Sequence, residues 1–120
     1  MSLRDLHAAW AWVVVIANAA VGGWALAAHR FPALRTTALW RSTLVAELTV
    51  FVQVILGVVL VKADGYPLPR FHAFYGFVAI ASIGIIYSYR SQLRHRLYLL
   101  YGFGGLFLMG LAIRAMVLHN

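Results

Sequence analysis

The sequence of 120 residues contains no cysteine and only three acidic residues, Asp5, Glu47 and Asp64. Without cysteine the chain has no disulfide, no thiolate metal ligand and no thiol nucleophile. With so few acids it also has few candidates for general acid–base catalysis. Charged residues make up 11% of the chain, whereas about 25% is usual in soluble domains. The composition is therefore not that of a soluble globular domain.

Several signatures of catalysis are also missing. The sequence has no serine–histidine–aspartate grouping, no HExxH motif, no phosphate-binding loop and no paired carboxylates. We therefore expect no independent enzymatic activity. The net charge of +7 comes largely from arginines near the ends of apolar segments, where they would meet anionic lipid headgroups. Nucleic acid is consequently not an expected partner.

Four apolar blocks fill most of the chain, at about residues 6–28, 39–61, 71–89 and 97–118. Each block has roughly the 20 residues that a helix needs to cross a bilayer. Inside a bilayer the backbone must form its hydrogen bonds within the segment, which favours helices. We predict an all-α, four-helix transmembrane bundle that forms one domain over residues 1–120. Short connections predict antiparallel neighbours in up-down-up-down order.

The first block is longer than the apolar core of about 7–15 residues in a signal peptide, so we expect a retained helix. Basic residues predict the orientation of the bundle. Most of them lie in or beside the first and third connections: Arg30, Arg35, Arg41, Arg90, Arg94 and Arg96. Because cytoplasmic loops are enriched in arginine and lysine, we expect a multi-pass protein of the bacterial inner membrane with both termini outside the cytoplasm.

Small residues recur at a spacing of three or four in two blocks, which is typical of closely packed transmembrane helices. In the first block the stripe consists of Ala19, Gly23 and Ala27. In the fourth block it consists of Gly102, Gly105 and Ala112. We predict a helix–helix contact along each stripe.

A histidine recurs at the start of the first and third blocks. The stretches LHAAWAW at 6–12 and FHAFYGF at 71–77 align His7 with His72. The pattern fits either a degenerate two-helix duplication or two independent membrane entries that favour aromatic residues. Both blocks begin on the same side of the membrane, and Arg114 lies near that side on the fourth block. His7, His72 and Arg114 are therefore predicted to lie in one layer.

Two neutral imidazoles on facing helices are suitable axial ligands for haem iron, and arginine binds carboxylates such as haem propionates well. In this respect the chain resembles four-helix cytochrome b-type bundles. The resemblance implies haem b bound by His7 and His72, with Arg114 at a propionate. The chain departs from that pattern because those proteins place their ligands a turn or more inside the membrane, whereas these histidines begin their apolar blocks.

Large aromatic residues follow both histidines, and we expect Trp10, Tyr75 and Phe77 to fill the space beneath them. We therefore predict that the two histidines lie together without a cofactor or a metal, and haem b is the alternative. A copper site that includes Met116 is a third option.

Three polar side chains lie inside predicted spans. Asn18 and Gln53 have matching depths, which predicts a hydrogen bond between neighbouring helices, and Thr49, Gln53 and Gly57 share one inward face. Glu47 is the only acid inside a span, and burial of a carboxylate there requires a partner. The candidate partners of Glu47 at similar depth are Trp24, Tyr87, Tyr101, Arg90 and Arg96.

The second half of the chain, from His72 to Met116, resembles small four-span membrane proteins of high-GC bacteria. That resemblance implies the topology and no activity. Short loops and missing catalytic motifs favour an accessory or assembly subunit of a larger membrane complex, for example a respiratory complex. The expected partner is such a complex or further copies of the same chain in a homo-oligomer. The alternatives are a haem b electron-transfer protein and a small proton-coupled transporter that uses Glu47.

Overall fold

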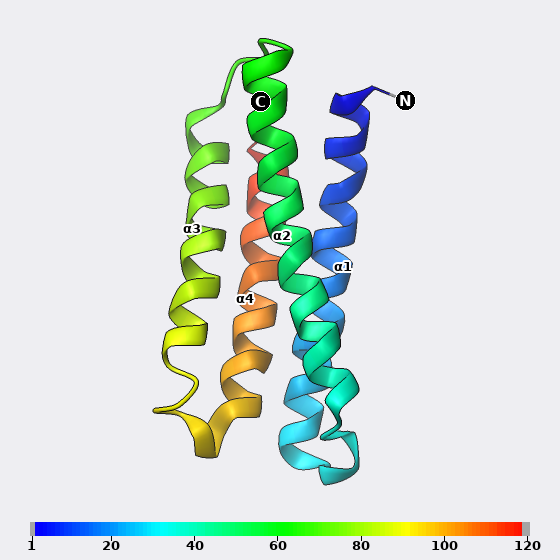
Figure 1. Ribbon diagram of the computed structural model, residues 1–120, viewed down its shortest axis with the longest axis vertical. Helices are drawn as coiled ribbons and strands as arrows, with labels where there is room; N and C mark the ends of the chain where they lie inside the picture. The colour runs from blue at the N-terminus through cyan, green and yellow to red at the C-terminus, as the bar shows by residue number, and fades with distance from the viewer. Residues whose placement is uncertain (1, 119–120) are drawn as a thin grey trace.

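The computed structural model describes residues 2–118 and contains no strand within that range. Its four long helices are α1 (Leu3–Arg30), α2 (Thr37–Ala63), α3 (Arg70–Ser88) and α4 (Leu97–Val117) (Figure 1). All four are long and apolar enough to cross a membrane. The predicted four-helix bundle of a small multi-pass membrane protein is confirmed, and each helix begins and ends within three residues of its predicted bound. Which end faces the cytoplasm stays a prediction.

Local sequence explains where the helices begin and end. Ser2 caps α1, because its hydroxyl accepts from the backbone N–H of Asp5 while the Asp5 carboxylate accepts from the backbone N–H of Ser2. The short connection after α1 contains a 3-10 turn, Pro32–Leu34. After α2, Gly65 has a positive φ of 71°, which side chains other than glycine rarely adopt. The connection before α4 ends in a second 3-10 turn, Arg94–Arg96.

The four helices do not pack against one another equally. The most extensive contact joins α1 to α4, the first and last helices, and α1 also packs on α2 while α3 packs on α4. In contrast, α2 and α3 touch only slightly, although they follow each other in the chain. In Figure 1, α4 accordingly lies between α1 and α3. The predicted antiparallel pairing of neighbours therefore holds for α1–α2 and α3–α4 and is weak for α2–α3.

Glycines form the α1–α4 contact. A Cβ atom added to Gly22 would lie 2.9 Å from the backbone nitrogen of Leu106, and one added to Gly105 would lie 2.9 Å from the Cα of Gly22. The predicted face of α4 is therefore correct, since Gly102 also lies against α1.

The predicted face of α1 is wrong. Gly23 is exposed, with nothing within 4 Å of an added Cβ atom, while Gly22, Ala25 and Ala28 are buried. One residue along a helix corresponds to a rotation of about 100°. Because α1 is apolar on most sides, its hydropathy alone does not specify which side faces the protein.

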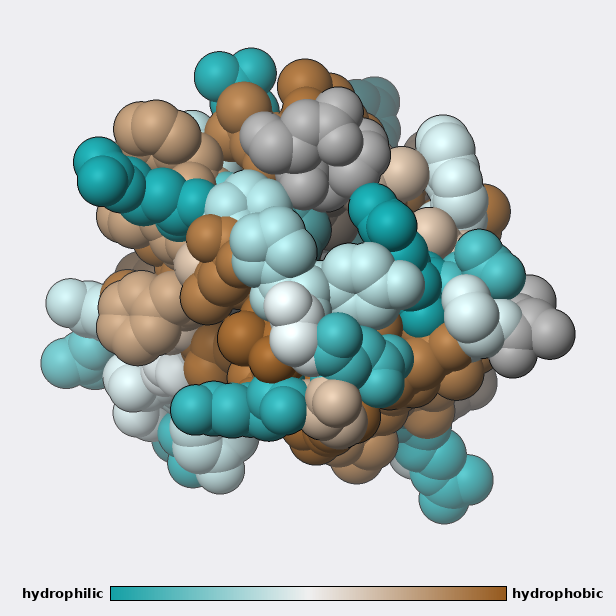
Figure 2. All heavy atoms as spheres, turned by 90° about the horizontal axis from the view of Figure 1, so that it is seen from above, coloured by the Kyte–Doolittle hydropathy of each residue, from teal (hydrophilic) through white to brown (hydrophobic). Residues whose placement is uncertain are grey.

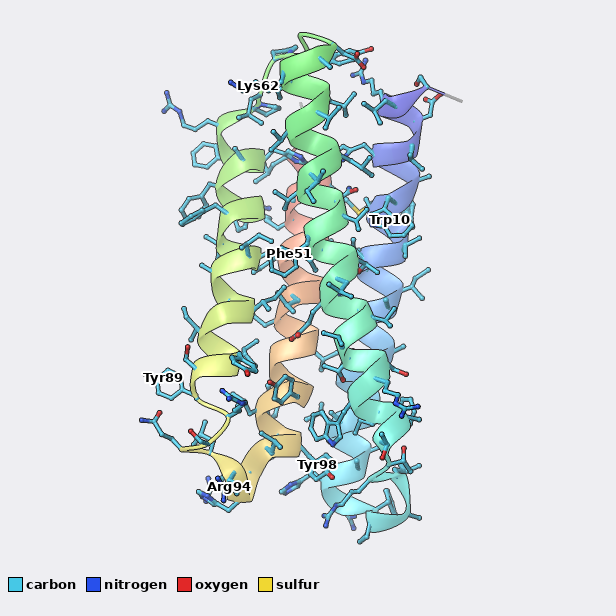
Figure 3. The ribbon with its side chains drawn as sticks, in the orientation of Figure 1. Trp10, Phe51, Lys62, Tyr89, Arg94 and Tyr98 are labelled. Carbon is cyan, nitrogen blue, oxygen red and sulfur yellow. The ribbon has the colours of Figure 1, made fainter. Side chains whose placement is uncertain are left out.

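The outer surface of the bundle is apolar along its length and polar at its ends. Large hydrophobic side chains are exposed on all four helices, as they would be against lipid. From the end that carries the α2–α3 connection, hydrophilic side chains lie over the bundle, with hydrophobic ones between and around them (Figure 2). Lys62 lies at this end, whereas Tyr89, Arg94 and Tyr98 lie at the opposite end (Figure 3). This distribution matches a membrane span with interfacial aromatic and basic residues.

Candidate functional site

The two histidines of the repeated motif meet inside the bundle. The ring centroids of His7, on α1, and His72, on α3, are 6.0 Å apart, and their planes are inclined at 74°. Since α4 lies between α1 and α3, the imidazoles join helices on opposite sides of the bundle. The prediction that these two residues share one layer is confirmed by this distance.

A backbone carbonyl orients the His72 ring. Its Nδ1 atom lies 2.7 Å from the carbonyl oxygen of Ala115 on α4, which accepts a hydrogen bond from the Nδ1 N–H. A histidine held in this way keeps its proton on Nδ1 and has a lone pair on Nε2. Metal-binding histidines commonly have such a contact. Ala115 was not a candidate residue, because a backbone acceptor leaves no signature in the side-chain sequence.

His7 contacts α2 through both its backbone and its ring. The side-chain amide of Gln53 donates to the backbone oxygen of His7, at 2.9 Å. A Cβ atom added to Gly57 would lie 3.3 Å from Cε1 of His7, so glycine leaves room for the ring. The predicted inward face of α2 is confirmed at these two residues. Within residues 2–118, the Nδ1 atom of His7 is buried and has no hydrogen-bond partner.

The histidine pair lies below the end of α2. His7 is level with Gly57, and α2 continues for five more residues to Lys62, or about 7.5 Å. His7 is nevertheless the fifth residue of α1, and His72 is the third residue of α3. The expectation that both stand at the entrances of their own spans stays a prediction.

Two of the three expected aromatic residues lie in the protein interior. Trp10 and Tyr75 pack against the buried core that contains Val14 and Leu108, and the Trp10 indole donates to the backbone oxygen of Thr49 at 2.9 Å. The third expectation is wrong, because the side chain of Phe77 is 71% exposed. Phe77 follows Tyr75 by two residues, which is a rotation of about 200° on a helix and turns its side chain away.

Basic residues surround this end of the bundle. Arg114 directly precedes Ala115, so it is level with His72, and its side chain is exposed. Arg4 stacks over the ring of Tyr66 at 4.8 Å from its centroid. Lys62 and Arg70 are also exposed at the ends of α2 and α3. An anionic group at the mouth of the histidine site would therefore find cationic neighbours.

The predicted hydrogen bond between Asn18 and Gln53 is not formed. Asn18 is buried and donates to the backbone oxygens of Val14, at 2.9 Å, and Ala46, at 3.4 Å. Gln53 donates to His7 instead. Both amides thus bind backbone oxygens, and both tie α1 to α2. The position of each residue in a shared interface was predicted correctly, whereas the partner was not.

The Glu47 carboxylate is half-buried at the other end of the bundle. Among residues 2–118 it has no hydrogen bond and no ion pair, so the expected structural partner is not found. Tyr101, one of the predicted neighbours, interacts electrostatically with Glu47, Arg90 and Tyr87. Tyr101 also packs edge-on against Trp40, with centroids 5.3 Å apart. Three of the predicted neighbours of Glu47 therefore lie at this end of the bundle, although none of them pairs with its carboxylate.

The donor set limits the kind of metal that the histidine pair can bind. Nowhere in residues 2–118 do three or more His, Cys, Asp or Glu side chains come together. Protein-only zinc sites need at least three such ligands. Two histidines alone suit a metal whose other ligands come from a macrocycle, as in haem.

Comparison with known proteins adds no identification: no family model matches the chain, and no curated protein or solved structure is significantly similar to it.

Proposed function

We propose that the protein is a small membrane cytochrome in which His7 and His72 bind the iron of haem b. The observation that carries this proposal is the 6.0 Å separation of the two imidazole centroids. Two imidazoles that bind one metal ion from opposite sides, with metal–nitrogen bonds of about 2.0 Å, have centroids roughly 6 Å apart. The pair thus has the spacing that the metal requires.

The surroundings of each ring support the same assignment. The Ala115 carbonyl keeps the proton of His72 on Nδ1 and leaves Nε2 as a ligand. On the other ring, a buried nitrogen of His7 without a partner is costly unless it binds something. Gly57 leaves space beside that ring, where any side chain would press on it. These contacts fix the His72 ring and leave a nitrogen of each ring without a protein hydrogen bond, which supports the assignment of the pair as ligands.

Haem held by two histidines would supply one-electron transfer. The chain itself would hold and orient the group. His7 and His72 would bind the iron, and exposed arginines such as Arg114 would neutralise propionates at the nearby end of the bundle. Electron transfer, rather than catalysis on a bound substrate, is the activity that follows.

The test is the visible spectrum of the protein purified from cells supplied with haem precursors. We expect a Soret band whose reduced form has the sharp α band of a six-coordinate b-type haem. His7→Ala and His72→Ala should each remove or strongly weaken that spectrum. His29→Ala and His95→Ala are matched controls, because both residues are exposed and lie at the opposite end of the bundle.

A folded wild-type protein that takes up no haem would contradict the proposal and favour the histidine pair without a cofactor. A Soret band that persists in the double variant His7→Ala, His72→Ala would contradict it as well. The accessory-subunit and transporter roles stay predictions, since no feature of residues 2–118 identifies a partner or a substrate path.

A further inference from the structure

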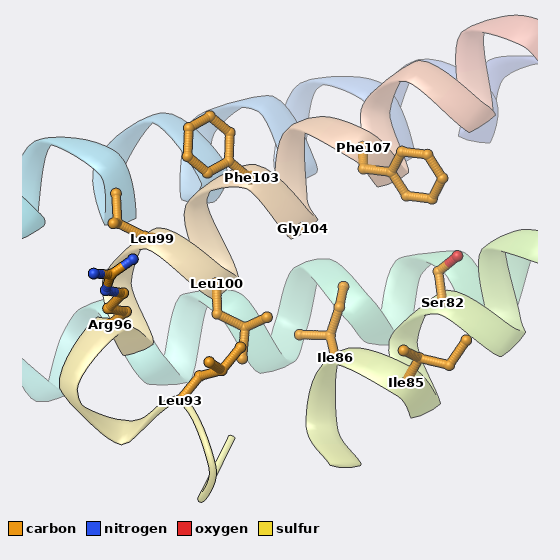
Figure 4. A pocket seen from close by; sticks show the side chains of 10 residues that line it. All are labelled: Ser82, Ile85, Ile86, Leu93, Arg96, Leu99, Leu100, Phe103, Gly104 and Phe107. Carbon is orange, nitrogen blue, oxygen red and sulfur yellow. The ribbon is translucent and has the colours of Figure 1, made fainter. Parts of the chain in front are cut away.

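A groove runs between α3 and α4 in the half of the bundle away from the histidines. Its volume is about 720 Å³, and it is open on its outer side. Figure 4 shows its two ends: Leu93 and Arg96 lie at one, and Ser82 and Phe107 lie toward the other. Gly104 forms part of its wall, where an added Cβ atom would lie 2.6 Å from the side chain of Ile86.

The length of the groove matches one leaflet of a bilayer. From Arg96 to Phe107 the chain advances eleven residues, or about 16 Å along a helix. Half of a hydrocarbon layer of about 30 Å is about 15 Å. The groove thus extends from the membrane interface, at the α3–α4 connection, to the middle of the bilayer.

The wall of the groove is suited to an acyl chain. Apart from Arg96, Ser82 is its only polar side chain, and the Ser82 hydroxyl already donates to the backbone oxygen of Val78 at 2.7 Å. No hydrogen-bonding group in the deep part of the groove therefore needs a polar ligand. Aliphatic and aromatic side chains such as Ile85 and Phe103 supply the remaining surface.

The interfacial end of the groove is cationic. Residues 65–120 contain no aspartate and no glutamate. The carboxylate of Glu47, on α2 at the same end of the bundle, forms no ion pair within residues 2–118. Arg90 already donates to the backbone oxygen of Tyr87 and stacks over its ring at 3.6 Å. Arg96 is exposed, and within residues 2–118 its guanidinium has no hydrogen bond or ring contact.

The first turn of α4, directly after Arg96, also has no side-chain cap. Its backbone N–H groups and the helix dipole favour an anion at the same place. Arg96 and the start of α4 therefore lie at the same end of the groove, and both favour an anion there.

We propose that this α3–α4 groove binds one anionic phospholipid. An acyl chain lies against the apolar wall, and the phosphate binds the Arg96 guanidinium and the start of α4. This inference does not depend on haem, because the groove and the histidines lie at opposite ends of the bundle.

Native mass spectrometry of the protein in mild detergent tests the proposal, with phosphatidylglycerol and phosphatidylcholine of identical acyl chains as probes. We expect one phosphatidylglycerol to be retained about fivefold more strongly than phosphatidylcholine, as one additional charge contact at the surface implies. Inorganic phosphate in excess should not displace it, because it lacks the acyl chain.

Two variants separate the parts of the site. Arg96→Gln should remove the preference for the anionic lipid, while Arg30→Gln, which removes an exposed charge from the α1–α2 connection, should keep it. Ile85→Trp should fill the groove and weaken the binding of both lipids. Ile55→Trp is its control, since Ile55 on α2 is 60% exposed and Ile85 is 58% exposed.

Equal retention of the two lipids by the wild type would overturn the proposal. Equal losses from Arg96→Gln and Arg30→Gln, or from Ile85→Trp and Ile55→Trp, would also overturn it, because either would indicate general adhesion to the surface. Circular dichroism checks that each variant is folded. If Arg96→Gln is not folded, Arg96→Lys replaces it. Because lysine keeps the positive charge, Arg96→Lys should retain the preference for phosphatidylglycerol, and a loss of that preference would count against the site.

Discussion

The α1–α4 and α2–α3 contacts are two opposite ways of joining transmembrane helices. In the first, backbones touch through Gly22 and Gly105, and there is no room for another carbon atom. In the second, consecutive helices touch only slightly. Since lipid is as apolar as the protein interior, helices in a bilayer gain stability from close packing and hydrogen bonds rather than from burial. The α1–α4 contact should therefore supply much of the stability of the fold.

The histidine site is held by the two remaining helix contacts, α1–α2 and α3–α4. His7 belongs to α1, the helix with the tightest packing, and α2 holds it through Gln53. His72 belongs to α3, and its ring is held by Ala115 of α4. The α2–α3 side of the site has few contacts of its own. A group between the rings would add a connection between α1 and α3 in the less tightly packed half.

The largest effect is expected from enlarging a glycine at the tight contact. Gly22→Ala places a Cβ atom at 2.9 Å from backbone of α4, which cannot move aside as a side chain can. We expect the free energy of unfolding to fall by about 1–3 kcal/mol. Gly23→Ala is the neighbouring control with open space around it, and it should leave stability unchanged or raise it by up to about 1 kcal/mol. Thermal unfolding in detergent measures both, and similar losses would refute the assigned face of α1.

A smaller effect is expected from removing one hydrogen bond between α1 and α2. Trp10→Phe deletes the indole N–H that donates to Thr49 while it keeps an aromatic ring in the core. Interhelical hydrogen bonds in membranes contribute about 0.6–2 kcal/mol. Trp12→Phe is the control, because Trp12 is 58% exposed. A Trp10→Phe protein that unfolds at the same denaturant concentration as Trp12→Phe would mean that this bond contributes nothing.

The smallest effect on stability is expected at Glu47. Because no residue of the described chain pairs with its carboxylate, Glu47→Leu breaks no ion pair or hydrogen bond and removes a polar group from a span. We expect thermal stability to stay the same or to rise. A clear loss of stability in Glu47→Leu, but not in Glu47→Gln, would reveal a structural partner. Loss of ion or substrate transport in folded Glu47→Gln would instead support the transporter alternative.

The sequence predicts the helices well and their rotation poorly. Hydrocarbon thickness and the lengths of the apolar blocks determine how many helices there are and where they end, so those predictions agree with the structure. Rotation depends on which side of an all-apolar helix meets another helix. Gly102 and Gly105 were placed correctly, but Gly23 was preferred to Gly22, and Phe77 was placed inside although it points outward.

The candidate site was predicted in part for a similar reason. The repeated motif and the matching depth of His7 and His72 indicated that the two rings would lie together. The contact of His72 with the Ala115 carbonyl and the alignment of His7 with Gly57 were not predictable, because both depend on how far neighbouring helices are shifted along each other. Asn18 and Gln53 illustrate the same limit, since each donates a hydrogen bond to a backbone oxygen at its own depth and not to the other side chain.

The closest helix contact also has a consequence for biogenesis, because it joins the first and the last of the four helices. A chain that is inserted from its N-terminus places α1 in the bilayer long before α4 has been synthesised. During that interval the Gly22 face of α1 has only lipid or α2 beside it, since its partner Gly105 does not yet exist. The bundle can therefore close only after α4 has been inserted. Until that step α1 remains available to any other helix with a small-residue face, and truncation before α4 should leave it in that state.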